Sequence, residues 1–156
     1  MLILRHTSAG EKVEPPSADR ARPLDTRGLA DARRLPMALA GYPIERVVSS
    51  PHRRCVDSVR PLARDRGVDV EIREELAPDA LLVDTRALLA ELPDESIVCT
   101  HREVIERLFR SRLECEKGGI WVIQSRGARL VPVEYLPLPE APGSRQPRSR
   151  KLVRSR

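Results

Sequence analysis

The chain of 156 residues suits a single domain, and its apolar runs are far shorter than the ~18 residues that a membrane-spanning helix needs. Its three cysteines form no C-x-x-C pair, which argues against a disulfide framework or a structural zinc site; with no targeting segment recognisable, we expect a cytoplasmic protein. The net charge of +5 would suit a nucleic-acid binder, but residues 1–139 hold 22 basic and 22 acidic side chains, so we expect neither a nucleic-acid partner nor a membrane.

Strands and helices are predicted to alternate along the first half of the chain. Residues 1–4 form an apolar strand, and a long polar loop with two adjacent prolines follows it. A helix is expected over residues 27–40, capped by Asp25 or Thr26 and kinked or shortened by Pro36. After a strand at 44–50, the next helix is expected to start with Ser50 as N-cap and Pro51 at the first helical position, and to stop at Gly67.

The second half continues the alternation and ends in a hairpin. The pattern predicts strands at 68–72 and 95–101 and helices at 84–92 and 102–113, followed by a hairpin over 119–136 that turns at Arg126 and Gly127. Residues 140–156 are rich in Pro, Ser and Arg and carry all the excess positive charge. We therefore expect a domain at 1–139 and a disordered basic tail at 140–156.

This order of elements predicts an α/β fold. The expected architecture is a three-layer sandwich, in which a mainly parallel central sheet is covered by helices on both faces.

Basic side chains follow three of the predicted strands at the point where each strand ends. Arg5 and His6 follow the first, Arg54 follows the second, and His101 follows the fourth. Because ligands bind beyond the carboxyl ends of parallel strands, where helix N-termini also point, these side chains are expected to meet at one edge of the sheet. Two imidazoles and two guanidiniums suit an anion with several oxygens, and phosphate fits best.

Each of these residues also has a plainer interpretation when it is taken alone. His6 could be structural, and Arg5 could belong to a surface ion pair. His52, at the start of a helix, is expected to be solvated. Cys99 and His101 alternate to one face of a strand, but no third ligand has suitable spacing, so no metal site is predicted.

Four segments in this order, "LRHTSAG", "RPLDTRG", "SSPHRRCVDS" and "CTHREVI", resemble the histidine phosphatase (phosphoglycerate-mutase-like) superfamily. They match its R-H-G-type start, its R-P-L-x-x-x-G motif, its S-S-P-x-x-R-x-x-x-[TS] helix and its late histidine. The resemblance extends over about residues 2–133. The short format is similar to the SixA-type phosphohistidine phosphatases, and is closer still to the phosphatase half of actinobacterial two-domain MutT-type Nudix hydrolases.

The resemblance implies a role for each matching residue. His6 would accept the phosphoryl group, Arg5 and Arg54 would clamp its oxygens, and His101 would stabilise the group during transfer. Arg22, which opens the R-P-L run, is a candidate for a further phosphate contact, with a solvated loop charge as its alternative. No metal and no other cofactor is implied, because arginines hold the position that magnesium has in other phosphoryl-transfer enzymes.

The sequence departs from the family pattern in two ways. Thr7 replaces the usual glycine after R-H and would offer a hydroxyl donor to the substrate. No motif identifies a general acid; Glu74, Glu75 and Asp79 are candidates, of which we choose Glu75, although each could equally be a surface charge. Without an acid, phosphohistidine and phosphoanhydride substrates are favoured over sugar phosphates, because their leaving groups depart without a strong proton donor.

The expected function is therefore that of a metal-independent phosphatase that works through a phosphohistidine at His6. A SixA-like phosphohistidine phosphatase acting on a phosphorylated protein is the first hypothesis, and a phosphatase of nucleotides or other small phosphorylated molecules is the second. A non-catalytic phosphate-binding module is the alternative from another class. A separate Nudix-type enzyme is a candidate partner.

Overall fold

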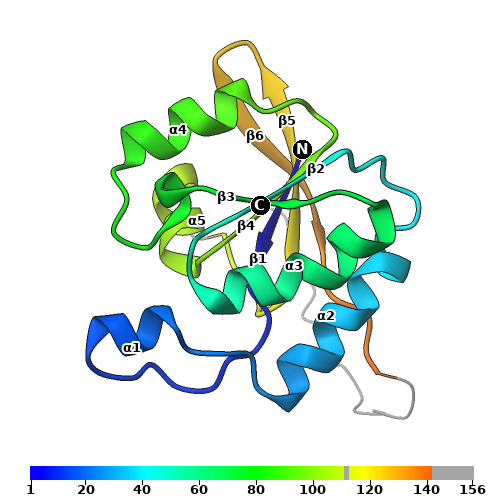
Figure 1. Ribbon diagram of the computed structural model, residues 1–156. Coiled ribbons are helices and arrows are strands. Elements are labelled where there is room, and N and C mark those ends of the chain that lie inside the picture. The colour runs from blue at the N-terminus through cyan, green and yellow to red at the C-terminus, as the bar shows by residue number, and fades with distance from the viewer. Residues whose placement is uncertain (111–112, 142–156) are drawn as a thin grey trace, which may run out of the picture.

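The computed structural model describes residues 1–110 and 113–141 of the chain, so most of the predicted tail lies outside the described residues. One six-stranded sheet forms the centre of the molecule (Figure 1). The strands are β1 (Leu2–Arg5), β2 (Arg46–Ser49), β3 (Val70–Ile72), β4 (Ser96–Thr100), β5 (Ile120–Arg126) and β6 (Arg129–Leu136). The helices are α1 (Pro16–Arg20), α2 (Thr26–Ala38), α3 (Arg53–Arg66), η1 (a 3-10 turn, Glu74–Leu76), α4 (Leu82–Glu91) and α5 (Arg102–Phe109).

The sheet is mixed, with the strand order β3-β2-β4-β1-β5-β6. The four strands β1 to β4 are parallel to one another, whereas β5 runs antiparallel to β1 and β6 antiparallel to β5. The parallel part forms because each of these strands returns through a helix, while β5 and β6 are joined by a tight turn with Gly127 at φ 62°. The prediction of a mainly parallel sheet is confirmed.

The helices cover both faces of the sheet and complete three layers (Figure 1). Alternate side chains of β1 point to opposite faces: Leu2 and Leu4 join a core with α2 and α3, and Ile3 joins the core with α4 and α5. The strands β1, β2 and β4 are buried on both faces, which explains why they are continuous apolar runs in the sequence. The three-layer prediction is therefore confirmed.

Most helix boundaries differ from the prediction by one to four residues, and two of these differences have identifiable reasons. The helix α2 begins as expected, because the side chain of Asp25 accepts a hydrogen bond from the Gly28 N–H, but it ends at Ala38, two residues after Pro36. The helix α3 begins at Arg53 with His52 as its N-cap, so the assignment of Ser50 as N-cap was wrong. Ser50 is fully buried; its hydroxyl lies 2.8 Å from His101 Nε2 and also accepts from the His52 N–H at 3.4 Å.

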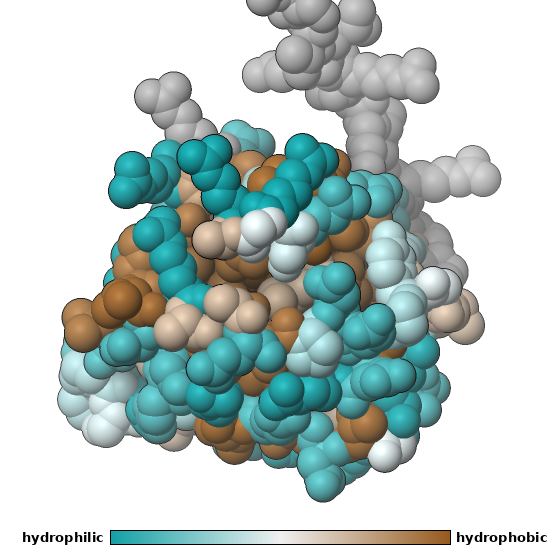
Figure 2. Space-filling model, turned by 90° about the horizontal axis from the view of Figure 1, so that it is seen from above, coloured by the Kyte–Doolittle hydropathy of each residue, from teal (hydrophilic) through white to brown (hydrophobic). Residues whose placement is uncertain are grey.

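The segment between β1 and α2 was expected to be a polar loop, but it contains the short helix α1. This segment lies at the same end of the molecule as the carboxyl end of β1 (Figure 1). The opposite end is mainly hydrophilic, and hydrophobic residues show between the polar ones (Figure 2). Among the described residues, no helix is both long and apolar enough to cross a membrane.

Candidate active site

The register of the parallel strands brings the predicted residues to one edge of the sheet. Arg5 pairs with Thr100 across β1 and β4, so His6 and His101 follow at the same level. The His6 N–H donates to the Thr100 carbonyl (3.1 Å), and the ring centres of His6 and His101 are 5.4 Å apart. The strand β2 ends beside β4 in the same register, which delivers the start of α3 to this edge. The expectation that these strand ends would meet is met by the geometry.

The ring of His6 is held with its Nε2 atom free. Its Nδ1 lies 2.8 Å from the Thr7 carbonyl oxygen, and a carbonyl only accepts, so Nδ1 carries the proton and donates it. Nε2 then keeps its lone pair. Burial, followed in this direction by the charges of Arg54 and Arg5, lowers the pKa of His6 to about 3, against the smaller opposing effect of the Thr7 hydrogen bond. The imidazole is therefore neutral at neutral pH, as a nucleophile must be.

His101 is almost completely buried beside His6. Arg54 Nη2 lies 3.4 Å from His101 Nδ1, and because a guanidinium only donates, Nδ1 is the acceptor of this pair. Nε2 therefore carries the proton and donates to the Ser50 hydroxyl at 2.8 Å. Burial is the largest cause that lowers the pKa of His101 to about 2, and the neighbouring charge of Arg54 adds to it.

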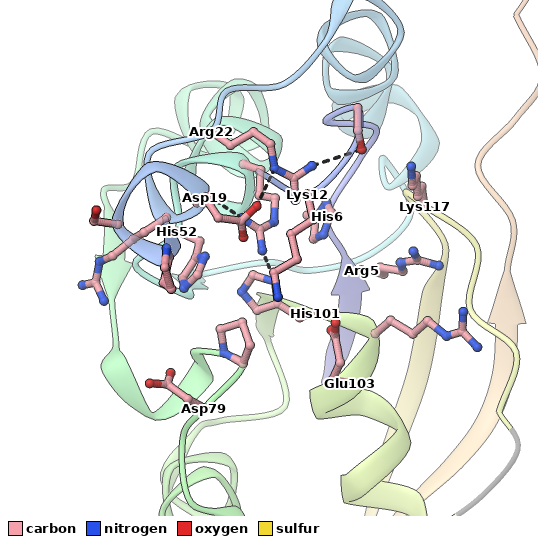
Figure 3. A pocket seen from close by; sticks show the side chains of 17 residues that line it. Arg5, His6, Lys12, Asp19, Arg22, His52, Asp79, His101, Glu103 and Lys117 are labelled. Carbon is pink, nitrogen blue, oxygen red and sulfur yellow. Dashed lines mark hydrogen bonds and ion pairs between the residues drawn. The ribbon is translucent and has the colours of Figure 1, made fainter. Parts of the chain in front are cut away.

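Arg54 lies in the first turn of α3 and is only 5% exposed. Its Nη1 donates to the Asp19 backbone carbonyl (2.8 Å) and lies 3.3 Å from the Asp19 carboxylate. Asp19 also pairs with Arg22, at 2.9 Å between Oδ1 and Nε. The short helix α1 thus supplies one buried carboxylate that orients two arginines. Figure 3 shows Asp19 and Arg22 in the same pocket as His6, His52 and His101.

Arg5 is fixed at the other side of His6 by a different contact. Its Nη1 donates to the Cys115 carbonyl at 2.7 Å. Its Nε, like the Nε of Arg54, is a buried donor without a partner among the described residues. Both guanidiniums therefore retain capacity to bind an anion.

These side chains line a pocket of about 630 Å³, a size typical of small-molecule sites (Figure 3). Arg5, His6, Arg22, Arg54 and His101, all chosen from the sequence, contribute to its wall. Arg22 is not a solvated loop charge, because it pairs with Asp19 and donates to the carbonyls of Ala9 and Gly10.

Two sequence candidates lie away from this pocket. Thr7 is fully buried, and its hydroxyl donates to the Gly28 carbonyl rather than pointing at a ligand. Glu75 does not line the pocket; it pairs with Arg73 at 2.7 Å, and this hydrogen bond lowers the pKa of the carboxyl. A general acid needs the opposite shift.

The expectation that His52 is solvated was wrong. The side chain is 9% exposed, lines the pocket, and its ring centre lies 4.8 Å from that of His101 in an edge-to-face arrangement. Burial and then the charges of Arg54 and Arg20 lower the pKa of His52. The error arose because Pro51 and His52 lie before the helix, where the chain passes under α1 instead of facing solvent.

Sequence reasoning also missed three contributors to the site, which are Asp19, Glu103 and Ser58. Asp19 was part of a presumed loop, and nothing in its neighbourhood indicated burial. Glu103 is an exposed carboxylate on the pocket wall, and so is Asp79, which the sequence had offered as a candidate general acid. Ser58 ends the "SSPHRRCVDS" motif, and its hydroxyl accepts from the Thr7 N–H at 3.0 Å; its place four residues after Arg54 could have indicated a contact at this end of α3. Among the described residues, no group of three or more His, Cys, Asp or Glu side chains could hold a metal ion.

Known proteins are similar to this chain in sequence and in fold. A family model described as the histidine phosphatase superfamily (branch 1) matches residues 1–78, half of the chain. The 8-oxo-(d)GTP phosphatase of Mycolicibacterium smegmatis is 28% identical over 156 residues. That match covers 90% of this chain and 48% of the relative, so the chain spans about half the length of this curated relative.

Solved structures share the fold. The protein histidine phosphatase SixA, complexed with tungstate, superimposes with a TM-score of 0.74 at 21% identity, covering 86% of this chain and 94% of that one. A SixA protein from Agrobacterium tumefaciens, described as a phosphohistidine phosphatase, gives 0.67 at 21% identity, with 87% and 96% covered. A mycobacterial glucosyl-3-phosphoglycerate phosphatase gives 0.65 at 14% identity, with 83% and 96% covered. Since the family model spans half of the chain and contains the motifs around His6 and Arg54, this protein belongs to the histidine phosphatase superfamily.

Proposed function

We propose that the protein is a metal-independent phosphatase in which His6 forms a phosphohistidine intermediate. The observation that carries the proposal is the tautomer of His6, which leaves Nε2 unprotonated and facing a pocket rich in guanidinium groups. A neutral imidazole beside fixed positive charge suits attack on a phosphorus atom, because the charges stabilise the equatorial oxygens without reorganising.

Arg5 and Arg54 are the proposed clamp for the phosphoryl oxygens. Each has a buried Nε donor without a partner among the described residues, and an unsatisfied buried donor costs about 1–3 kcal/mol. A phosphate oxygen that accepts from these donors would remove that cost. Arg22 is held by Asp19 and would contribute positive charge from the wall of the pocket.

His101 is the proposed stabiliser of the group in transfer. Its Nδ1 is turned toward Arg54, and its Nε2–H is fixed by Ser50, so the ring orientation is set before a ligand arrives. In the proposed reaction, Nε2 of His6 attacks phosphorus and the leaving group departs with the electron pair of the broken bond. Water then attacks the phosphohistidine, the nitrogen regains its electron pair, and a water proton passes to solvent or to the released phosphate.

The carboxylates of the pocket favour leaving groups that need no strong acid. Asp19 is engaged by two arginines, and hydrogen bonds and positive charges hold its pKa below the usual range, outweighing its burial. Asp79 and Glu103, the other two carboxylates on the pocket wall, are exposed. Phosphohistidine and phosphoanhydrides therefore fit better than alkyl phosphates.

Two substrate classes follow. A protein phosphohistidine is the class suggested by the SixA-type structures, and a nucleotide is the class suggested by the name of the curated relative. A side-by-side turnover comparison of a phosphohistidine protein, a nucleoside triphosphate, a nucleoside monophosphate and a sugar phosphate would separate them.

The catalytic proposal itself is tested with p-nitrophenyl phosphate in EDTA. His6→Ala should lose at least 1,000-fold in kcat while keeping the thermal unfolding midpoint near that of the wild type. The wild type should also form an acid-labile phosphoprotein that the variant lacks. Equal rates for the two proteins would overturn the proposed catalytic role of His6.

A further inference from the structure

The basic side chains around the pocket differ in whether they have a carboxylate partner. Seven basic side chains line it: Arg5, Lys12, Arg20, Arg22, Arg54, Arg102 and Lys117. Four of them have carboxylate partners: Arg20 with Glu74, Arg22 and Arg54 with Asp19, and Arg102 with Glu106. Within residues 1–110 and 113–141, the other three have no ion pair, and two of these are the lysines.

Lys117 is attached to a fixed part of the backbone. The next residue, Gly118, donates its N–H to the carbonyls of Arg5 (3.0 Å) and His6 (3.2 Å), and its φ of 78° favours glycine. Lys117 is therefore held close to the end of β1, because the residue next to it is hydrogen-bonded to Arg5 and His6. Figure 3 shows Lys117 and Arg5 on the same side of the two histidines.

Lys12 is held between two anchored neighbours on the other wall. The Gly10 N–H donates to the Asp25 carboxylate at 3.1 Å, and the Val13 N–H donates to the Asp19 carboxylate at 3.2 Å. The contact with Asp19 ties the Lys12 segment to the same group that orients Arg54. Both lysines therefore lie on segments that tertiary contacts hold in place.

Of the carboxylates near the two lysines, Asp19 and Asp25 are already engaged, whereas Asp79 and Glu103 are exposed on the pocket wall. Asp25 accepts from the Ser8 hydroxyl and from the N–H groups of Gly10 and Gly28, so its oxygens are occupied, although the charge of Lys117 contributes weakly to lowering its pKa after these hydrogen bonds. Asp19 is shared between two arginines. Seven basic side chains against three carboxylates line the cleft, and such an excess of one charge raises the local concentration of polyanions.

The use of lysine itself singles out this place. The chain has only three lysines among its 28 basic residues, and both of those that lie in the described part of the structure line this pocket. A lysine ammonium is a compact charge with three donors on a flexible stem, which suits a phosphate that varies in position.

We propose that Lys12 and Lys117 bind a second phosphate that is joined through an anhydride oxygen to the phosphoryl group attacked by His6. The substrates are then phosphoanhydrides such as nucleoside diphosphates or triphosphates. This inference rests on the proposed function of His6 and selects one of its two substrate classes.

The chemistry is balanced without a general acid. The bond between His6 Nε2 and the terminal phosphorus forms as the bond from that phosphorus to the bridging oxygen breaks, and the bridging oxygen keeps the electron pair. The leaving phosphate gains negative charge, which the two ammonium groups stabilise in the transition state. This role replaces the proton that an alkoxide would need, in agreement with the exposed positions of Asp79 and Glu103.

Binding can be measured apart from turnover with two non-hydrolysable inhibitors. Methylphosphonate offers one anionic group, and methylenediphosphonate offers two. Both are tested as competitive inhibitors of p-nitrophenyl phosphate hydrolysis in EDTA. In the wild type, the diphosphonate should bind at least ten-fold more tightly. The double variant Lys12→Ala, Lys117→Ala should lose most of this difference, while Arg33→Ala, which removes an exposed positive charge on α2 outside the pocket, should keep it.

Turnover supplies the second measurement. For ADP and inorganic diphosphate, kcat/KM should fall at least ten-fold in the double lysine variant, whereas that for p-nitrophenyl phosphate should fall less than three-fold. Equal inhibition by the two phosphonates in the wild type would overturn the inference. It would also be overturned if the wild type turned over a phosphohistidine protein faster than ADP and the double lysine variant slowed both substrates by the same factor. If hydrolysis persists in His6→Ala, the proposed function itself fails. If hydrolysis depends on His6 but no preference for two phosphates is found, only the present inference fails.

Discussion

The carboxylate of Asp19 lies 3.3 Å from Arg54 Nη1, and both side chains are about 95% buried. Because Asp19 also binds Arg22, it fixes two guanidiniums in the wall of the pocket. We expect Asp19→Asn to lower kcat for p-nitrophenyl phosphate at least ten-fold with less than a three-fold change in KM, because Arg54 keeps its charge but loses its orientation. Steady-state kinetics measures this split.

Stability provides an independent check on the role of Asp19. Removing one partner of a buried ion pair costs about 3–5 kcal/mol, so the unfolding midpoint should fall. Phosphate in solution should restore more stability to Asp19→Asn than to the wild type, since it can take the place of the missing carboxylate between the two arginines. Glu74→Gln, which removes an exposed pair with Arg20, is the control and should change neither property. An equal phosphate effect in the two proteins would contradict a positioning role.

Gly28 lies in the first turn of α2 where the helix touches the segment after His6. A Cβ atom at this position would overlap the Ser8 carbonyl oxygen, whereas one at Gly41 would meet no atom within 4 Å. We expect Gly28→Ala to lower the unfolding midpoint and the kcat for p-nitrophenyl phosphate. This is the opposite of the effect of helix propensity, since alanine stabilises a helix by about 1 kcal/mol relative to glycine. Gly41→Ala should leave both near wild-type values. If thermal unfolding shows the two variants equally stable, this close approach does not constrain the site.

The same contact explains why part of the site could be predicted and part could not. The glycine of the "RPLDTRG" segment and the strand ends at His6 and His101 follow from local sequence patterns, because a strand, its end and its following helix are encoded by neighbouring residues. The register of β1, β2 and β4 then brings Arg54, His6 and His101 together. A prediction of parallel strands is therefore enough to place these three residues in one site.

Asp19 and His52 depend on tertiary packing instead. Both are buried only because α1 folds over the start of α3, and a polar segment of the sequence gives no sign of this. Ser50 was assigned as an N-cap from its position before Pro51, but its hydroxyl is used by His101, which lies 51 residues later in the chain. Competition between a local cap and a distant partner cannot be decided from periodicity.

Two of the three buried histidines, His6 and His101, should make stability strongly dependent on pH. The pKa values of His6 and His101 are lowered to about 3 and about 2, mainly by burial, from the ordinary value near 6.5. Below pH 6.5 the unfolded chain therefore binds protons that the folded chain does not, so stability is lost as the pH falls. Each imidazole should contribute a loss of about 1.4 kcal/mol between pH 7.5 and 5.5.

Urea unfolding at these two pH values measures the loss. His6→Asn, which removes one of the two groups, should show a smaller decrease than the wild type over the same interval. The ion-paired carboxylates do not interfere, because those whose pKa is lowered, such as that of Asp19, change the stability only at more acidic pH. A free energy of unfolding that stays constant between pH 7.5 and 5.5 would show that the histidines titrate normally in the folded state.

The hydroxyl of Ser50 lies 2.8 Å from His101 Nε2, and the serine is fully buried. Ser50→Ala would leave the buried N–H of His101 with only Cys55 Sγ at 3.5 Å, so we expect a loss of about 1–3 kcal/mol in the free energy of unfolding and a fall in kcat with little change in KM. Ser96 is the matched control, because it is equally buried in the neighbouring strand but its hydroxyl has no partner among the described residues. Ser96→Ala should therefore cost much less. Urea unfolding and steady-state kinetics on both variants provide the comparison, and equal losses would mean that Ser50 fills space without orienting the histidine.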